Sequence, residues 1–183
     1  MTDIWLVRHG EAAASWEQSP DPGLSALGHQ QARAAAEILH RQVPNEVSLL
    51  TSPKARARET GEPLALLRQS VLVEHPAFTE VHAPVPMSAR KVWLREFMGQ
   101  RWSEQPAPLW QWRNTIADAM RTTNDATIVF THFLVINAVL AECRGRDEVL
   151  QAWPANGSIY HFRMDAGRIE LVALGEQMES VVN

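Results

Sequence analysis

The sequence predicts an α/β fold in which a mostly parallel sheet lies between two layers of helices. Short apolar runs of strand length alternate with longer segments rich in helix-forming residues, a pattern that favours parallel strands joined by helices. The end of the chain instead alternates apolar and polar residues around a short turn sequence, which indicates an antiparallel hairpin. We therefore expect a three-layer α/β sandwich with an antiparallel C-terminal hairpin, formed by residues 1–183 as one domain.

The first half of the chain contains three apolar runs of strand length, separated by two helical segments. The strands are expected over residues 4–7, 47–50 and 71–73. The first helix follows a loop rich in Pro and Gly, has Ser25 as its N-cap and includes residues 31–39. The second helix is expected to have Ser52 as its N-cap and Pro53 at its first position, and to end near Leu67.

The second half begins with a segment of mixed character. Prolines at positions 84, 86, 106 and 108 interrupt it, and helices are expected over residues 88–98 and 109–121. Residues 126–131 are expected to form the fourth parallel strand, and the apolar residues 133–143 a buried helix. The hairpin is expected to pair residues 158–164 with 168–174 around a turn at 165–167.

Composition and charge argue against several classes of protein. The chain has 17 Lys and Arg against 21 Asp and Glu, a formal net charge of −4, and so lacks the basic excess typical of nucleic-acid-binding proteins. Its single cysteine, Cys143, cannot form a disulfide within the chain. We see neither an apolar run of membrane-spanning length nor a basic, apolar leader. We expect a cytoplasmic protein that binds neither nucleic acid nor a membrane; its oligomeric state is not predicted.

Charged and titratable residues stand where the predicted parallel strands end. The first strand ends on Arg8 and His9, and the second leads into a helix whose first turns carry Arg56. The fourth strand ends on His132, and Glu80 follows the third strand after a short loop. Because the carboxyl ends of parallel strands meet at one edge of an open sheet, we expect these side chains to share a site.

These residue types suit the chemistry of a phosphate group. Arginine presents a planar fork of donors that matches phosphate oxygens, and a neutral histidine can accept a phosphoryl group. A second histidine beside phosphate is expected to be protonated, and a carboxylate there to have a raised pKa, which suits a general acid. Gly10 is expected to permit the bend that brings Arg8 and His9 to one phosphate. The histidines lack zinc-type spacing, so we expect no metal and no cofactor.

Five segments of the chain carry motifs of one known family. They are LVRHGE at residues 6–11, LSALGHQQA at 24–32, SPKARARET at 52–60, TH before an apolar helix at 131–132, and NGSI at 156–159. In this order, and in these structural contexts, they resemble the histidine phosphatase superfamily, also called phosphoglycerate mutase-like. The resemblance spans most of the chain and implies the same α/β fold.

The resemblance also implies a role for each residue at the strand ends. His9 would be the phosphorylated nucleophile, and Glu80 would donate a proton to the leaving group. Arg8, Arg56 and His132 would hold the phosphoryl oxygens. Arg58, two residues after Arg56, is expected to be structural.

The chain departs from the mutase branch of this family at three points. Ser15 stands where that branch has an asparagine six residues after its histidine, and Phe133 stands where a glycine usually follows the second histidine. The sequence HAPVP, which begins at His82, replaces the mutase continuation after the glutamate. These departures argue against mutase activity, and they make Ser15, His82 and Phe133 the candidates for contact with the substrate.

Two further expectations concern residues 81–112. The tryptophans at positions 93, 102, 110 and 112 are expected to pack this segment, with a lid over the site as the alternative. Arg90, Lys91 and Arg95 are expected to form a solvated face, and they are also the only candidates to hold a second anionic group of the substrate.

We therefore expect a phosphatase that hydrolyses a small phosphorylated substrate through a phosphohistidine on His9. Two alternatives stay open at this point. One is a phosphoglycerate mutase-type enzyme, which returns the phosphoryl group to a substrate instead of water. The other is a non-catalytic module that binds a phosphorylated ligand on the same fold, although such a module needs no nucleophile. The sequence does not distinguish among sugar phosphates, nucleotides, phosphoproteins and phospholipid head groups as substrates.

Overall fold

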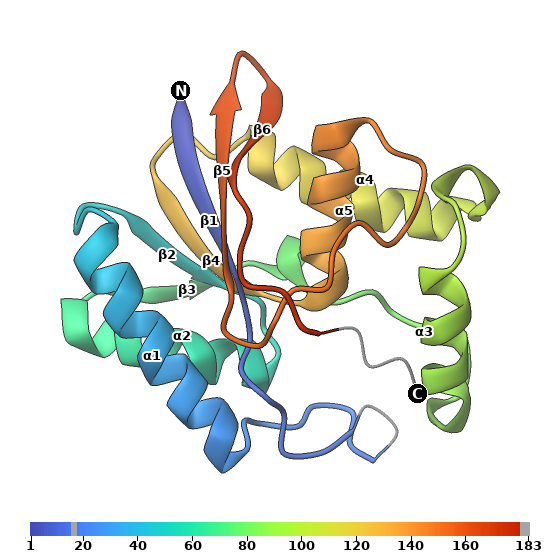
Figure 1. Ribbon diagram of the computed structural model, residues 1–183, viewed down its shortest axis with the longest axis horizontal. Coiled ribbons are helices and arrows are strands. Elements are labelled where there is room, and N and C mark those ends of the chain that lie inside the picture. Colours follow the sequence, from blue (N-terminus) through green and yellow to red (C-terminus); the bar gives the residue numbers. More distant parts are fainter. Residues whose placement is uncertain (16–17, 180–183) are drawn as a thin grey trace.

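A six-stranded sheet with the order β3-β2-β4-β1-β5-β6 forms the centre of the computed structural model, which describes residues 1–15 and 18–179. Its strands are β1 (Thr2–Arg8), β2 (Ser48–Thr51), β3 (Leu72–Glu74), β4 (Thr127–Thr131), β5 (Ile159–Asp165) and β6 (Arg168–Ala173). Strands β1 to β4 are parallel to one another. Strand β5 pairs antiparallel with β1, and β6 antiparallel with β5 (Figure 1). The predicted mostly parallel sheet with an antiparallel C-terminal hairpin is confirmed.

Helices cover both faces of this sheet (Figure 1). The α-helices are α1 (Ala26–Gln42), α2 (Ala55–Arg68), α3 (Arg90–Met98), α4 (Ala107–Arg121) and α5 (Phe133–Arg144). Short 3-10 turns are η1 (Pro76–Phe78), η2 (Met87–Ala89) and η3 (Trp102–Glu104). Helices α1 and α2 pack on one face and α4 and α5 on the other, while α3 lies at the margin of the molecule. The predicted three-layer arrangement is confirmed.

Alternate residues of the central strands face the two helical layers. Ile4 and Leu6 of β1 pack with α4 and α5, whereas Val7 of β1 and Phe130 of β4 pack with α1 and α2. All four side chains are fully buried. Burial on both faces is typical of parallel strands, and it holds the carboxyl ends of β1 and β4 at a defined place in the fold.

The start of α1 is tied to the loop after β1. Ser25 is its N-cap, as predicted, because Ser25 Oγ accepts a hydrogen bond from the Gly28 N–H (3.0 Å). The Ser25 hydroxyl also donates to Glu11 Oε1 (2.8 Å), and Gln31 Oε1 accepts from the Glu11 N–H (2.8 Å). The Ser and Gln of the second motif therefore hold the segment that follows His9.

The start of α2 differs from the prediction. Lys54 is the N-cap residue, without a side-chain cap, and the helix begins at Ala55 instead of Pro53. Ser52 Oγ lies 2.8 Å from His132 Nε2, and it accepts only a weak bond from the Lys54 N–H (3.3 Å). The Ser-Pro pair imitates a helix-start signal, but the serine pairs with a side chain from the end of β4.

Other boundaries shift by one or two residues. Helix α3 begins at Arg90 because residues 87–89 form the 3-10 turn η2. Helix α4 begins at Ala107, since a proline is tolerated in the first turn of a helix. The hairpin turn consists of Ala166 and Gly167, with φ of +47° and +79°, because Asp165 still belongs to β5. Positive φ at both residues is typical of a two-residue hairpin turn.

The chain leaves β1 after Arg8, and Gly10, two residues further on, lies at a point of close packing. Positive φ occurs at Gly145, Gly157 and Gly167, but not at Gly10. A Cβ on Gly10 would lie 2.4 Å from the carbonyl oxygen of Gly28, and a Cβ on Gly28 would lie 2.1 Å from that of Glu11. The two glycines let α1 approach the chain after β1. An added methyl group here would cost about 1–3 kcal/mol through overpacking.

The tryptophans of the middle segment pack together beside α4. Trp102 is 1% exposed, and its ring centroid lies 5.8 Å from that of Trp110 and 6.3 Å from that of Trp112. The Arg113 guanidinium lies 4.9 Å from the Trp102 ring centroid, a cation–π contact. Arg113 Nη2 also lies 3.1 Å from Glu142 Oε2 on α5. These contacts confirm the predicted packing role.

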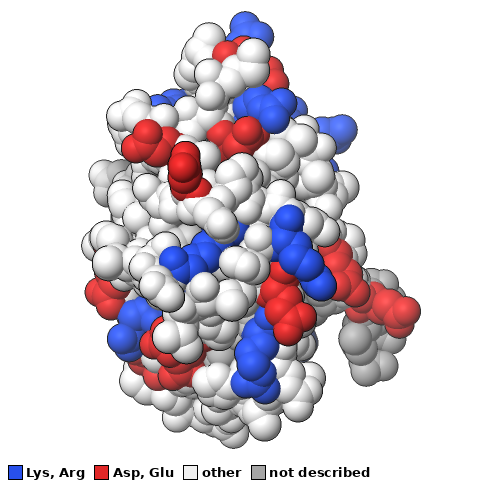
Figure 2. Space-filling view, turned by 90° about the vertical axis from the view of Figure 1, so that its left-hand side faces the viewer, with Lys and Arg blue, Asp and Glu red and all other residues white. Residues whose placement is uncertain are grey.

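The surface on the side of α1 and α2 carries both signs of charge. Figure 2 shows Lys and Arg side chains interspersed with Asp and Glu over this face, as is usual for a solvent-exposed surface. In the described part of the chain, no helix is both long enough and apolar enough to cross a membrane.

Candidate active site

Hydrogen bonds hold the backbone at the end of β1. The His9 N–H donates to Thr131 O at the end of β4 (2.9 Å), and the Gly157 N–H donates to Arg8 O (2.9 Å). The Asn156 side-chain amide donates to His9 O (3.0 Å). Gly157 has φ of +75°, a conformation that favours glycine. The turn that carries the NGSI motif therefore holds the backbone of both Arg8 and His9.

The hydrogen-bond partners of the His9 ring assign its tautomer. Nδ1 lies 2.7 Å from Gly10 O, and a carbonyl can only accept, so Nδ1 carries the proton. The Arg56 Nε–H donates to His9 Nε2 (3.1 Å), so Nε2 carries the lone pair. Burial, followed by the charges of Arg56 and Arg8, lowers the pKa of His9 well below its usual value. His9 is therefore neutral, with Nε2 as its basic nitrogen.

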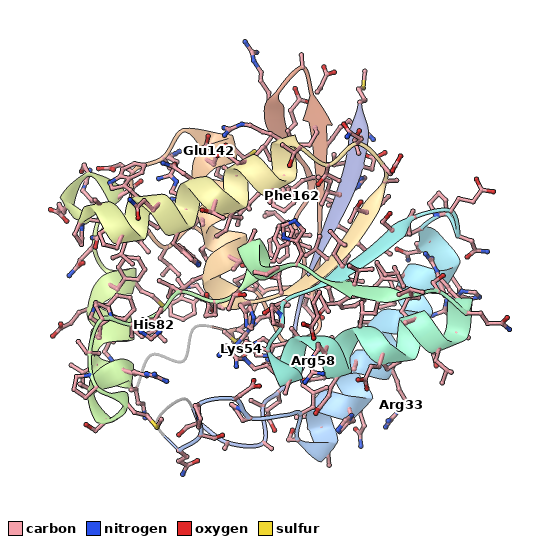
Figure 3. The ribbon with its side chains drawn as sticks, turned by 180° about the vertical axis from the view of Figure 1, so that it is seen from behind. Arg33, Lys54, Arg58, His82, Glu142 and Phe162 are labelled. Atoms are coloured by element: carbon pink, nitrogen blue, oxygen red, sulfur yellow. The ribbon has the colours of Figure 1, made fainter. Side chains whose placement is uncertain are left out.

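Arg56 and Arg58 have different surroundings on α2. Arg56 is 6% exposed, and its Nη1 has no hydrogen-bond partner among the described residues. Thr60 Oγ1 accepts from the Gly10 N–H (3.0 Å) and donates to Arg56 O (2.7 Å), which ties this turn of α2 to the chain after β1. The Arg58 side chain is 43% exposed, and its Nε lies 3.6 Å from Glu74 Oε1 (Figure 3).

Arg8 is held against the opposite wall of the site. Its Nη1 donates to Pro154 O (2.6 Å) and contacts Met178 Sδ (3.3 Å), and its guanidinium lies 5.2 Å from the centroid of the Phe133 ring. Burial lowers the pKa of Arg8 to about 10, while the nearby Glu80 carboxylate acts in the opposite direction. Arg8 therefore remains a cation at neutral pH.

His132 is buried directly beside His9. Its Nε2 lies 2.8 Å from Ser52 Oγ, and its ring meets the His9 ring edge-on, with centroids 5.2 Å apart. Burial, followed by the charges of Arg56 and His9, lowers the pKa of His132 well below its usual value. The protein's own groups thus favour neutral His132 when no anion is bound. A bound anion would act in the opposite direction, because it would stabilise the charged ring.

Two hydrogen bonds hold the segment before Glu80. The Thr131 hydroxyl donates to Phe78 O (2.8 Å), and the Trp112 Nε1–H donates to Thr79 O (2.9 Å). The first bond joins this segment to the end of β4, and the second joins it to α4. Glu80 is therefore held at the same sheet edge as His9, although no strand leads directly into it.

The Glu80 carboxylate lies at the start of α5. Its Oε2 accepts from the Leu134 N–H (3.2 Å), and its Oε1 accepts from the Val81 N–H (3.1 Å). Burial raises the pKa of Glu80, whereas these two hydrogen bonds and the charges of Arg56 and Arg8 act to lower it. The burial effect is the largest, so the carboxyl group keeps its proton to a higher pH than an exposed glutamate.

Four of these side chains border one cavity of about 330 Å³, whereas His132 lies beside His9 and is not part of the described wall. Its polar wall consists of Arg8, His9, Arg56 and Glu80. The rest of the wall is apolar and consists of Ala12, Ala14, Pro22, Leu94, Met98, Phe133, Leu134, Trp153 and Met178. Arg8 Nε, Arg56 Nη1 and His132 Nδ1 are buried nitrogens without a partner among the described residues. Two cations with unused donors at the end of a concave pocket are suited to bind an anion.

The structure places only one of the three candidates for substrate contact at the cavity. Phe133 lines the cavity, but Ser15 and His82 do not. Ser15 takes part in a local turn, where its N–H donates to Gln18 Oε1 (3.1 Å). His82 is exposed beside α3 (Figure 3). Sequence position alone suggested both residues, and both are exposed outside the described wall.

Residues 90–112 fit the expected packing of the tryptophans but neither of the alternative roles, a lid or a second anion site. The described cavity wall includes none of the cations at positions 90, 91 and 95, and none of the tryptophans at 93, 102, 110 and 112. Helix α3 instead contributes Leu94 and Met98, which share one face because they are four residues apart. The cations therefore do not form a second anion site on this wall, and the tryptophans do not form its lid.

Sequence reasoning missed Ser52, Trp153 and Met178. Ser52 was visible in a motif but was interpreted as a helix cap. Trp153 and Met178 are adjacent because the chain at 177 forms a β-bridge with Pro154 and the Met178 N–H donates to Trp153 O (2.7 Å). No local pattern predicts such a pairing. Within the described residues, no group of three or more His, Cys, Asp and Glu side chains could hold a metal ion.

Solved structures with a similar fold cover almost the whole chain. YhfR of Bacillus stearothermophilus is 18% identical, with a TM-score of 0.79 over 97% of this chain and 98% of that one. Phosphoserine phosphatase from Entamoeba histolytica, in complex with 3-phosphoglyceric acid, is 18% identical, with a TM-score of 0.75 over 97% and 98%. A mycobacterial glucosyl-3-phosphoglycerate phosphatase complexed with VO3 is 19% identical, with a TM-score of 0.70 over 93% and 97%. At these identities the likeness concerns the fold.

Comparison of the sequence with a curated protein and with a family model identifies the family of this chain. The PE-PGRS family protein PE_PGRS11 of Mycobacterium tuberculosis (strain ATCC 25618 / H37Rv) is 34% identical over 87 residues, which are 45% of this chain. The chain spans about 15% of the length of that curated relative. A family model for the histidine phosphatase superfamily (branch 1) matches residues 4–177, which include every residue of the polar cavity wall. The chain therefore belongs to the histidine phosphatase superfamily, branch 1.

Proposed function

We propose that this protein is a phosphatase that hydrolyses a small phosphomonoester through a phosphohistidine on His9. The observation that carries the proposal is the state of the His9 ring, with its proton on Nδ1 and its lone pair on Nε2. A nucleophile needs such a lone pair at a cavity wall. The family match and the phosphatases among its structural neighbours support a phosphoric monoester hydrolase.

In the first step, His9 Nε2 attacks phosphorus and the P–O bond to the leaving group breaks. The Arg56 Nε–H, which bonds to Nε2 at 3.1 Å, would transfer its hydrogen bond to a phosphoryl oxygen as Nε2 turns to phosphorus. Glu80, whose pKa is raised by burial, gives its proton to the leaving alkoxide. The products are an alcohol, phosphorylated His9 and ionised Glu80.

In the second step, water attacks phosphorus and the P–N bond breaks. The ionised Glu80 accepts a proton from this water, so that inorganic phosphate leaves and both His9 and Glu80 return to their initial states. Arg8 and Arg56 stabilise the phosphoryl oxygens in both steps, and His132 contributes a donor from beside the His9 ring. Electrostatic stabilisation of this kind is the usual main contribution to phosphoryl transfer.

The cavity wall favours a phosphatase over a phosphoglycerate mutase. A phosphoglycerate carries a carboxylate in addition to its phosphate, and a mutase must hold both. Among the described residues, Arg8 and Arg56 are the only Lys or Arg on the wall, and both belong to the phosphate end of the cavity. A non-catalytic binding module is disfavoured by the neutral His9, because a protonated histidine would hold an anion better.

The nucleophile can be tested with His9→Ala. We expect the variant to lose turnover of p-nitrophenyl phosphate by at least about 10³-fold, because the covalent route is removed. Wild-type protein quenched during turnover in EDTA should carry acid-labile phosphate, and His9→Ala should carry none. His29→Ala is the control, because the His29 side chain is 48% exposed and outside the site. Label that persists in His9→Ala would contradict the assignment, and loss of all activity in EDTA would contradict the expected independence from metal.

The anion site can be tested with two arginines of one helix. Arg56→Ala should weaken vanadate inhibition by about thirtyfold, since a charge-assisted contact is worth about 2 kcal/mol in such a site. Arg58→Ala should change it less than about twofold, because Arg58 is a surface residue. Arg56→Lys should recover only part of the loss, because lysine keeps the charge but not the planar fork. Equal losses in Arg56→Ala and Arg58→Ala would show that the phosphate is held elsewhere.

The proton donor can be tested with Glu80→Gln and two leaving groups. Phosphorylation of His9 by an alkyl phosphate should slow by about 10²- to 10⁴-fold, and phosphorylation by p-nitrophenyl phosphate much less, because nitrophenolate leaves without a proton. In wild-type protein, the alkyl phosphate step should slow as the pH rises through the raised pKa of Glu80. Single-turnover measurements separate this step from hydrolysis. Equal slowing with both donors would assign the proton to another group.

A further inference from the structure

We propose that the alcohol part of the substrate is apolar, so that the preferred substrates are small alkyl or aryl phosphates. This inference rests on the proposed function, because it concerns the leaving group of the same reaction. It depends on the part of the cavity wall that lies beyond the phosphate end. There, the described side chains offer hydrocarbon, aromatic and thioether surface to the group that the phosphate carries.

The charged and titratable side chains of the cavity lie at the end that would bind the phosphoryl group. Arg8, Arg56 and Glu80 surround the phosphoryl group and its leaving oxygen in the proposed reaction, together with His9. Every other described side chain on the wall is hydrocarbon, thioether or aromatic, and the indole N–H of Trp153 is the one hydrogen-bonding group among them. A sugar or a polyol enclosed there would lose hydrogen bonds to water with only this one side-chain partner to replace them, which costs free energy for each unpaired hydroxyl. An alkyl or aryl group loses nothing and gains from burial.

A ring contact and backbone hydrogen bonds hold the apolar side chains of the wall in place. The Phe133 and Trp153 rings lie 5.7 Å apart at 60°, and the Met178 N–H donates to Trp153 O (2.7 Å). The Ala155 N–H donates to Glu176 O (2.9 Å), which holds the two segments together on the other side of the β-bridge. Preorganised apolar side chains bind a ligand at lower cost than mobile ones.

The wall reaches directly to the phosphate end of the cavity. Arg8 Nη1 contacts Met178 Sδ (3.3 Å), and its guanidinium lies 5.2 Å from the Phe133 ring centroid. A phosphoryl group held by Arg8 therefore lies next to Met178 and Phe133. Even a short alkyl chain would meet apolar surface there.

The opposite wall comes from α3 and carries no charge into the cavity. Leu94 and Met98 face the cavity, while Arg90 and Arg95 do not line it. A phosphorylated substrate with a second anionic group would thus have no cation on this wall to meet it. The cavity volume of about 330 Å³ lies at the lower end of small-molecule pockets, which fits a short chain or a single ring.

The test compares leaving groups that differ in polarity but not in need for a proton. We expect kcat/KM for n-hexyl phosphate to exceed that for glycerol 1-phosphate by about tenfold or more, since each buried methylene is worth about fourfold. Glycerol is a slightly better leaving group than hexanol. Intrinsic reactivity alone would therefore favour glycerol 1-phosphate, which is the opposite of the order that we expect. Phosphoserine and 3-phosphoglycerate, which carry further charges, should be poorer than n-hexyl phosphate by a similar factor.

Binding without turnover provides the second measurement. Hexylphosphonate should inhibit or bind at least about tenfold more tightly than methylphosphonate, measured by competition with vanadate or by calorimetry. Leu94→Ser should reduce the hexyl-to-methyl ratio by about threefold or more. Val92→Ser, on the same helix but 59% exposed and absent from the wall, should leave the ratio unchanged. Trp153→Ser provides an independent test from the other wall, in case Leu94→Ser fails to fold.

The outcomes separate this inference from the proposed function. Turnover that favours glycerol phosphate or 3-phosphoglycerate, with phosphate on His9, would overturn the apolar leaving group and leave the phosphatase intact. Tighter binding of hexylphosphonate that depends on Leu94, without turnover of any ester, would support the apolar pocket and overturn the catalytic proposal. Equal binding of the two phosphonates would overturn the inference directly.

Discussion

The site depends on the hydrogen bond from the Arg56 Nε–H to His9 Nε2. A guanidinium always donates, so its partner nitrogen must carry a lone pair, and the Gly10 carbonyl takes the only ring proton on the other side. Burial reinforces this assignment, because a second cation beside Arg56 would be costly. One contact thus sets the charge and the tautomer of His9 together. The remaining elements of the fold bring the two side chains to this distance.

The described cavity wall carries a net positive charge, and this charge favours the binding of an anion. Arg8 and Arg56 give +2 and ionised Glu80 gives −1, so the described residues of the cavity wall carry a net charge of +1, or +2 when Glu80 is protonated. The neutral state of His9 and His132 limits this excess. Arg8 is partly compensated by Pro154 O and the Phe133 ring. The nitrogens of Arg8 and Arg56 that have no partner in the described part of the chain are the donors that a phosphoryl group would use.

The sheet and the polar end of the site were predictable from sequence because both follow from local patterns. Apolar runs mark buried strands, and the residues directly after them, such as His9 and His132, must lie at one edge of the sheet. Ser52 is not the predicted helix cap, because its partner, His132, comes from a distant segment; the close contact of Gly10 with Gly28 is likewise not visible in a local pattern. Phe133 was predicted to contact the substrate, but the rest of the apolar wall was not predicted, because Trp153 meets Met178 through a pairing that no local pattern encodes.

The ring state of His9 is the most direct test of this account, and ¹⁵N chemical shifts of the histidine side chains measure it. At pH 6.5 an ordinary histidine is about half protonated, given its usual pKa of about 6.5. Because the pKa of His9 is lowered well below that value, its ring should be neutral at this pH, with a protonated Nδ1 and an unprotonated Nε2. An imidazolium at pH 6.5, or a neutral ring with its proton on Nε2, would contradict the account.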